Sequence, residues 1–208
     1  MLEGNIEKKT DKKEKYLRRQ IEILNSAAAV FADKGYHGAS TSEIATNLGI
    51  AQSSLYYYFR SKDEALEMVC LHGAKGLIKK LTVIAESSQT TVKKIRAAIY
   101  NHIEPINSIP NYYKTFVQEL RYLPKSRRSK VNKIIIDYNT IFKKILDEGV
   151  ANATLKESID CHLSMLQIIC QCNAAAIWIN TKPEYNIKFI ADSIADNFLS
   201  GVINSKFN

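Results

Sequence analysis

The stretch "IAQSSLYYYFRSKDEAL", residues 50–66, decides the fold of this 208-residue chain. Three consecutive tyrosines stand between a short polar run and Phe59. Leu55 and Phe59 are four residues apart, so on a helix they share one face, which we expect to lie against the core. Tyr56 and Tyr57 then point away from that face, and the third tyrosine lies about 60° from Leu55 and is partly covered. The triplet therefore predicts an exposed aromatic surface beside a buried stripe.

Helical periodicity continues upstream of this stretch. Across residues 17–35 apolar side chains recur at steps of three and four, which predicts an amphipathic helix that Gly35 ends. The segment "STSEIATNLG" predicts a second, short helix with Thr41 or Ser42 as its N-cap and Gly49 as its terminator. A third short helix is predicted over "QSSLYYYF".

A fourth, longer helix is predicted over residues 62–85, with Ser61 as its cap. Two short helices joined by a glycine-containing turn and set on longer helices form a helix-turn-helix, whose second helix enters the major groove of DNA. An alternative is an ordinary amphipathic hairpin whose tyrosines fill a groove. The exposed face of the third helix offers groups that can donate to phosphates or touch base edges: Gln52, Ser53, Ser54, Tyr56 and Tyr57.

The charge of the chain also suits a polyanionic partner. It has 29 basic and 21 acidic residues, a net charge of +8, although such an excess also serves solubility. Residues 8–19 hold seven basic and two acidic side chains, and residues 121–133 hold six basic ones and no acid. We expect residues 1–15 to form a basic arm that adds electrostatic affinity for DNA, and the alternative is a disordered solubilising tail.

Several classes of protein are disfavoured by the sequence. No apolar run approaches the ~20 residues of a membrane span, and the N-terminus lacks an apolar signal segment, so we expect a soluble cytoplasmic protein. The four cysteines have no zinc spacing and are expected to be buried free thiols. The histidines are scattered, and no Glu-x-x-His pair, phosphate loop or nucleophile motif occurs. We therefore expect no enzyme, metal or cofactor.

Residues 23–66 carry an ordered pattern of motifs. An apolar helix ends in Phe-x-x-x-Gly-Tyr and is followed by Thr-Ser, Ile-Ala, a Gly-Ile turn, Leu-Tyr-x-x-Phe and Ser-Lys-Asp. This pattern resembles the DNA-binding domain of TetR-family transcriptional regulators, with one departure at Ala51, where a polar residue is usual. The matching residues are Phe31, Gly35, Tyr36, Thr41, Ser42, Ile44, Ala45, Gly49, Ile50, Leu55, Tyr56, Phe59, Ser61, Lys62 and Asp63.

The resemblance implies roles for single residues. Thr41 and Lys62, each at the start of a helix, would clamp phosphates, and Tyr57 would donate its hydroxyl to a phosphate. Gln52 would be the side chain able to make a bidentate pair with adenine. The implied DNA-binding set is Thr41, Ser42, Gln52, Ser53, Ser54, Tyr56, Tyr57 and Lys62.

The rest of the chain predicts a second helical unit. Helices are expected over residues 92–107, 111–122, 126–149, 157–180 and 186–204, with Pro110, Pro124 and Pro183 between them. The expected fold is all-α, with a helix-turn-helix domain over residues 16–62 and a ligand-binding and dimerisation domain over residues 63–208. The segment "CHLSMLQIICQCNAAAIWI" is apolar on nearly every face, so we expect a second copy of the chain to cover the last two long helices. Ala174, Ala175 and Ala176 would allow close approach in that homodimer.

The C-terminal half carries a weaker pattern. Glu-Leu-Arg stands before a proline, a tyrosine lies in mid-helix, one helix ends in Glu-Gly, and a tryptophan and a proline precede a last helix that ends in glycine. This is similar to the regulatory domain of TetR-type repressors of fatty-acid and sterol degradation, with departures at Asn152, Ala153 and Ile179. The matches are Glu119, Arg121, Pro124, Tyr138, Glu148, Gly149, Trp178, Pro183, Ile190, Ala191, Asp192, Phe198 and Gly201.

This second resemblance implies an acyl-CoA effector that releases a repressor from its operator by tilting the fourth helix. The phosphates would bind the basic cluster through Arg121, Arg127 and Arg128. Alternatives are an ordinary bundle core with a solvated basic face, a regulator of another lipophile or drug class, and a DNA-binding helical protein without an effector. The expected lining of the apolar tunnel is Ile99, Ile103, Phe116, Leu120, Tyr138, Phe142 and Met165.

Overall fold

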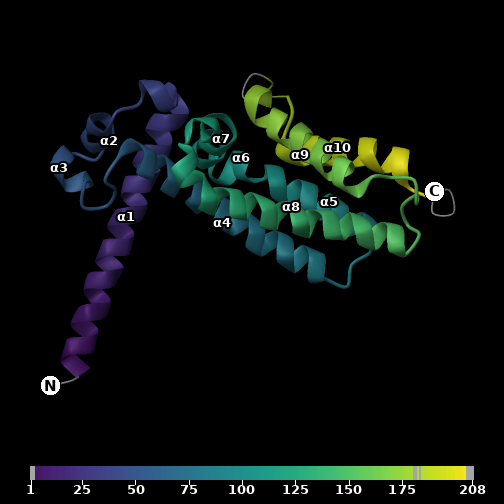
Figure 1. Cartoon of the computed structure of the whole chain (residues 1–208), viewed down its shortest axis with the longest axis horizontal. Helices are drawn as coiled ribbons and strands as arrows, with labels where there is room; N and C mark the ends of the chain where they lie inside the picture. Colours follow the sequence, from purple (N-terminus) through teal and green to yellow (C-terminus); the bar gives the residue numbers. More distant parts are fainter. Residues whose placement is uncertain (1–2, 180–181, 183, 205–208) are drawn as a thin grey trace.

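The computed structural model describes residues 3–179, 182 and 184–204, and it is built from helices. Helices α1 (Glu3–Gly38), α2 (Thr41–Asn47) and α3 (Gln52–Leu55) lie at one end, and α4 (Lys62–Glu86) leads from them into the remaining helices (Figure 1). No strand is formed within the described ranges, where Leu155 and Ile203 make an isolated bridge. The predicted all-α class, with a helix-turn-helix followed by a helical domain, is confirmed. We call residues 23–61 the reading head.

Helix α1 is longer than its apolar periodicity predicted. It begins at Glu3 rather than at Leu17, and its first half projects away from the rest of the molecule (Figure 1). The added segment is rich in lysine and glutamate, which favour helix without an apolar stripe. Gly35 interrupts the helix with φ of 70° and ψ of 168°, after which one more turn runs to Gly38. The predicted break at Gly35 is therefore correct, although it is not the last residue of the helix.

The two short helices differ from the prediction in detail. Ser40, not Thr41 or Ser42, is the N-cap of α2: its hydroxyl accepts from the Glu43 N–H, and Glu43 accepts in return from the Ser40 N–H, each at 3.2 Å. Helix α3 covers only Gln52–Leu55, because the chain turns immediately afterwards.

The tyrosine triplet forms that turn. The Tyr58 N–H donates to the Leu55 carbonyl at 2.8 Å, and the Phe59 N–H donates to the same carbonyl at 3.1 Å. Leu55 and Phe59 are buried, Tyr58 is half-buried, and Tyr56 and Tyr57 are exposed. The predicted division between a core stripe and an exposed aromatic surface is confirmed.

Ser61 caps α4 as predicted, since its hydroxyl accepts from the Glu64 N–H at 3.1 Å. The segment expected as one helix over residues 92–107 is split, because Pro105 has no N–H to continue α5 and opens α6 instead. The prediction for Pro183 lies outside the described residues. The remaining elements are α5 (Thr91–Ile103), α6 (Pro105–Ser108), α7 (Pro110–Glu119), η1 (Leu120–Tyr122), η2 (Lys125–Arg127), α8 (Arg128–Ala151), α9 (Cys161–Trp178) and α10 (Ile187–Val202).

Two apolar cores meet along α4. The first fills the reading head around Phe31 and Phe59 and continues into Tyr112 of α7 and Leu123. The second joins α5, α8, α9 and α10, and α4 contributes Leu81 to it. Helix α7 therefore lies where the two cores adjoin, packed against both α1 and α4.

Candidate functional site

The outer side of α3 and its turn presents the predicted DNA-contacting residues together. Gln52, Ser53, Ser54 and Tyr56 are exposed, and Tyr57 is 74% exposed. The Gln52 amide donates to the Thr41 hydroxyl at 2.7 Å, which joins the starts of α2 and α3. These side chains form a polar surface, and residues 50–60 contain no acidic group that would repel phosphates.

Tyr16 joins this surface and was missed by the sequence analysis. Its ring stacks on Tyr58 with centroids 5.1 Å apart and meets the edge of Tyr57 at 5.7 Å. The tyrosine turn is thus held against the first half of α1 by aromatic contacts. Tyr16 precedes the periodic part of α1, so the apolar pattern gave no signal for it.

Lys62 has an intramolecular role in this structure. Its ammonium donates to the carbonyl oxygens of Tyr36 at 2.8 Å and Ala39 at 3.0 Å, and it lies 4.5 Å from the centre of the Tyr36 ring. These contacts hold the last turn of α1 and the residue after it on the start of α4, and they leave one N–H of the ammonium for another acceptor. The phosphate contact of Lys62 stays a prediction, as do those of Thr41, Ser42 and Tyr57.

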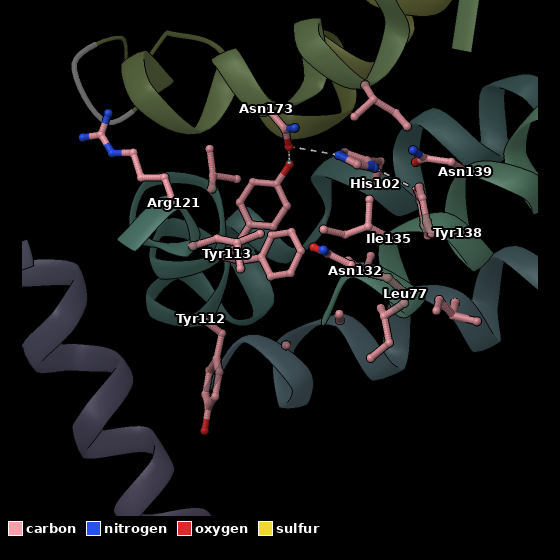
Figure 2. A pocket seen from close by; sticks show the side chains of 18 of the residues that line it. Leu77, His102, Tyr112, Tyr113, Arg121, Asn132, Ile135, Tyr138, Asn139 and Asn173 are labelled. Carbon is pink, nitrogen blue, oxygen red and sulfur yellow. Dashed lines mark hydrogen bonds between the residues drawn. The ribbon is translucent and has the colours of Figure 1, made fainter. Parts of the chain in front are cut away.

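A cavity of about 520 Å³ lies in the C-terminal half between α4, α7, α8 and α9 (Figure 2). Its apolar wall comes from Leu77 and Ile78 of α4, Phe116 of α7, Ile135 of α8 and Ile169 of α9. The volume falls in the range of small-molecule sites, about 300–1,000 Å³. The cavity can therefore take a lipophilic ligand.

Only part of the predicted tunnel borders this cavity. Phe116, Leu120, Arg121, Arg128 and Tyr138 lie on its wall. The other predicted apolar residues are packed in the second core, because their helix faces point at neighbouring helices rather than at the gap between α7 and α8. These residues are Ile99, Ile103, Phe142 and Met165, each fully buried.

The basic cluster is also less available than its acid-free sequence indicated. Arg127 donates to the carboxylate of buried Glu67 at 2.9 Å, and Lys130 lies 3.9 Å from the same side chain. Lys133 pairs with Asp137, one turn further along α8. The acidic partners are Glu67 of α4 and Asp137 of α8. The basic run contains no acid of its own, but the fold brings carboxylates beside several of its charges.

Two arginines of that cluster remain at the cavity. Arg128 donates to the carbonyl oxygens of Leu123 and Arg121, both at 2.6 Å, and so closes the loop between α7 and α8. Arg121 is exposed, lies 4.8 Å from the centre of the Tyr122 ring, and forms no ion pair with a described residue. Arg121 can therefore meet an anionic ligand group without giving up an ion pair, whereas Arg128 would have to give up its hydrogen bonds to the loop.

One wall of the cavity is polar. His102 Nδ1 lies 2.8 Å from the Tyr138 hydroxyl, His102 Nε2 lies 3.1 Å from Asn173 Oδ1, and Tyr113 donates to the same oxygen at 3.3 Å (Figure 2). Burial lowers the pKa of His102 to about 4 and raises the pKa of Tyr138 well above its usual value. The four residues come from separate helices, so no local spacing could have revealed the network, although Tyr138 was predicted as a lining residue.

Helix α7 uses two faces for two contacts. Tyr113 and Phe116 line the cavity, Thr115 and Glu119 contact α1, and Tyr112 borders the cavity and also contacts α1. Tyr112 donates to Asn25 Oδ1 at 2.8 Å, and Thr115 donates to the Ala28 carbonyl at 3.2 Å. The Tyr36 N–H donates to the Glu119 carboxylate at 2.7 Å. One helix therefore joins the wall of the cavity to the reading head.

Helices α9 and α10 lie together along one edge of the molecule (Figure 1). An apolar stripe on α9 is exposed at Leu163, Leu166, Ala174 and Ile177. Ala175, which was expected at a subunit interface, is instead fully buried in the core of its own chain. It lies on the face of α9 opposite to Ile177.

Of the four cysteines, Cys70 and Cys172 are buried, and burial raises the pKa of each thiol to about 12. Cys170 is exposed, contrary to the prediction of buried thiols, because it lies on the outer stripe of α9. Within the described ranges, no group of three or more His, Cys, Asp or Glu side chains is placed to hold a metal ion. None of the described helices is long and apolar enough to cross a bilayer.

We expect the buried imidazole to make stability depend on pH. The pKa of His102 is about 4 in the folded chain and about 6.5 when unfolded, so the unfolded state binds more protons between these values. Stability contributed by the neutral ring is complete above pH 6.5 and falls by about 3 kcal/mol as the pH drops to 4. In a His102→Leu variant, this pH dependence of the free energy of unfolding should vanish. Chemical denaturation of both proteins from pH 4 to 7 checks this, and parallel curves would contradict it.

The chain matches two families of known proteins. Residues 23–69 match the family described as "Bacterial regulatory proteins, tetR family", and residues 88–202 match "Tetracyclin repressor-like, C-terminal domain". The first segment contains the reading head, and the second contains the cavity lining except for the residues of α4, such as Leu77 and Ile78.

Individual relatives span nearly the whole chain. The fatty acid metabolism regulator protein of Bacillus subtilis (strain 168) is 26% identical over 187 residues, 89% of this chain and 96% of the relative. The HTH-type transcriptional repressor KstR2 of Rhodococcus jostii (strain RHA1) is 22% identical over 186 residues, 89% of each chain. The crystal structure of FadR from Bacillus subtilis in complex with stearoyl-CoA superposes with a TM-score of 0.75 at 25% identity, covering 87% of this chain and 98% of that one.

Both resemblances inferred from the sequence are thereby confirmed at the level of the family. The matched family and relatives are transcriptional regulators, which confirms the prediction that this chain is a regulator and not an enzyme. The chain belongs to the TetR family of bacterial regulatory proteins and is a DNA-binding transcriptional regulator.

Proposed function

We propose that this protein is a cytoplasmic repressor that binds an operator as a homodimer and leaves it when an acyl-CoA fills the cavity. The observation that carries the proposal is the position of α7, which lines the cavity with one face and holds the reading head with the other. The boundaries of a basic arm over residues 1–15, a helix-turn-helix over 16–62 and a regulatory domain over 63–208 are part of the proposal. A DNA-binding protein without an effector remains the competing function.

The choice of ligand class rests on the composition of the cavity. Its walls are mainly aliphatic and aromatic, as a long hydrocarbon chain requires, and each buried methylene stabilises binding by about 0.8 kcal/mol. Arg121 lies at one side of the labelled residues and offers an unpaired cation to a phosphate (Figure 2). The complex of the related FadR with stearoyl-CoA supports the same class.

The cavity can influence DNA binding through rigid contacts. Phe116 faces the cavity, and Thr115 and Glu119 of the same helix are both bonded to α1. A ligand that displaces Phe116 therefore moves the reading head with α7. A dimer reads half-sites about 34–36 Å apart, so a change in the distance between its two reading heads lowers operator affinity.

The proposed dimer uses the exposed stripe of α9 together with α10. Leu163, Leu166 and Ile177 follow one helix face, and Phe189 of α10 is also exposed. A contiguous apolar surface of this kind favours burial against a second copy. TetR-family regulators are dimeric, which supports the assignment.

The first test measures effector release. Palmitoyl-CoA should dissociate the protein from an operator selected in vitro from random duplexes, and acyl chains shorter by a few methylenes should require higher concentrations. An Arg121→Ala variant should respond to palmitoyl-CoA only at higher concentration, whereas Lys125→Ala, at an exposed lysine of η2 that does not line the cavity, serves as the matched control. Equal release by free palmitate would show that the effector is a simple lipophile rather than a CoA ester. Release by neither compound would favour the competing function, a DNA-binding protein without an effector.

The second test concerns DNA contacts. Gln52→Ala should relax the preference at one base step by ~1–3 kcal/mol, because a bidentate contact with adenine would be lost. Tyr57→Phe should weaken binding to all sequences alike, because a phosphate contact carries no base information. Tyr100→Phe, at an exposed tyrosine of α5, is the control. If both variants bind randomised duplexes as the native protein does, the exposed face of α3 and its turn is not the DNA-contacting surface.

The third test separates the interface from the core. Ile177 and Val83 are both 64% exposed, so replacement by aspartate should leave the fold of a single chain intact at either position. We expect Ile177→Asp to sediment as a monomer without operator affinity, because a carboxylate buried in the interface is costly. Val83→Asp should remain a dimer. A dimeric Ile177→Asp protein would show that α9 is not the interface.

A further inference from the structure

The carboxamide of Asn173 is the part of the cavity wall that points most directly to the chemistry of a ligand. Its oxygen accepts two hydrogen bonds, from Tyr113 at 3.3 Å and from His102 at 3.1 Å. A carbonyl oxygen has two lone pairs, so both are occupied by the protein. The amide nitrogen makes no hydrogen bond to any other residue in the described part of the chain.

The direction of these bonds is fixed by His102. The ring is buried and neutral, with a pKa of about 4, and a neutral imidazole carries one N–H. Asn173 Oδ1 cannot donate, so the hydrogen sits on Nε2, and Nδ1 accepts from the Tyr138 hydroxyl at 2.8 Å. The chain of bonds from Tyr138 through His102 to Asn173 therefore keeps the amide from turning over.

The consequence is a pair of N–H donors on the wall of an apolar cavity. A donor that loses water without gaining an acceptor costs free energy, so a ligand that fills the cavity binds best when it brings an acceptor oxygen to this point. Hydrocarbon alone would leave the amide without a partner. The wall therefore selects ligands that carry an acceptor oxygen, in addition to selecting for the length of their hydrocarbon chain.

We propose that the Asn173 amide receives a carbonyl oxygen of the effector, which in an acyl-CoA is the thioester carbonyl, and that His102 and Tyr138 are positioning residues for this contact. The inference rests on the proposed function. In an acyl-CoA the thioester lies between the phosphates and the hydrocarbon chain, and Asn173 lies between Arg121 and Tyr138 along the cavity (Figure 2). The order of phosphates, thioester and hydrocarbon chain in the ligand therefore matches the order of Arg121, Asn173 and Tyr138 along the cavity.

The test compares two ligands that differ at the carbonyl. Palmitoyl-CoA has the thioester, and S-hexadecyl-CoA has a methylene in its place with the same chain length and the same phosphates. Calorimetric titration of the dimer should give an affinity about tenfold higher for the thioester, the effect of one hydrogen bond formed in an apolar site. The preference for the thioester over the thioether is the quantity to follow in variants.

Three variants assign that preference to the network. Asn173→Leu removes the amide at similar volume and should bind both ligands equally. Tyr138→Phe removes the hydrogen bond to His102 Nδ1 and should reduce the ratio of the two affinities, whereas a general loss of packing would lower both affinities alike and keep the ratio. Gln171→Leu, an exposed amide on the same helix, should keep the full preference.

Two results would overturn the inference while leaving an acyl-CoA effector in place: equal affinity of the native protein for both ligands, or a preference that survives in Asn173→Leu. If neither CoA compound binds, the acyl-CoA proposal fails, and 2-undecanone and undecane then test the carbonyl contact without CoA. Tighter binding of the ketone, lost in Asn173→Leu, would support the inference. Equal binding of the two, or binding of neither, would overturn it.

Discussion

The hydrogen bond between the Tyr36 N–H and the Glu119 carboxylate is the contact on which the two halves of the molecule depend. Gly35 adopts a positive φ, which breaks α1 before its last turn and frees the following N–H from the helix. Glu119, nearly buried at the end of α7, accepts that N–H at 2.7 Å. A charged acceptor makes this bond stronger than a neutral one, so the end of α1 is tied to the helix that borders the cavity.

The reading head is built to move as one body. Lys62 is bonded to one carbonyl oxygen in the last turn of α1 and to one just after it, and Tyr16 packs on the tyrosine turn that follows α3. The first core also continues from Phe31 of the reading head into Tyr112 of α7 without a break. A signal from the cavity therefore reaches DNA as a change in the position of the whole reading head rather than as a rearrangement within it.

The sequence was most informative where structure is local. The Leu55 and Phe59 spacing, the break at Gly35 and the cap at Ser61 follow from helix geometry, and all three were predicted. Contacts between distant segments were not predictable in this way. Glu67 neutralises basic residues some sixty positions away, and the polar wall is assembled from α5, α7, α8 and α9, so neither leaves a pattern in the sequence. Cavity walls also depend on which face of a helix is covered, which explains why Phe116 was placed correctly and Phe142 was not.

The central claim is that the cavity and the DNA surface are energetically coupled through α7. Coupling is reciprocal, so DNA must change the affinity for the effector by the same factor by which the effector changes the affinity for DNA. The direct measurement is calorimetric titration of palmitoyl-CoA into the free dimer and into its complex with the selected operator. The account predicts weaker binding to the complex, by about 5–150-fold. Equal affinity for the free and the DNA-bound protein would contradict it.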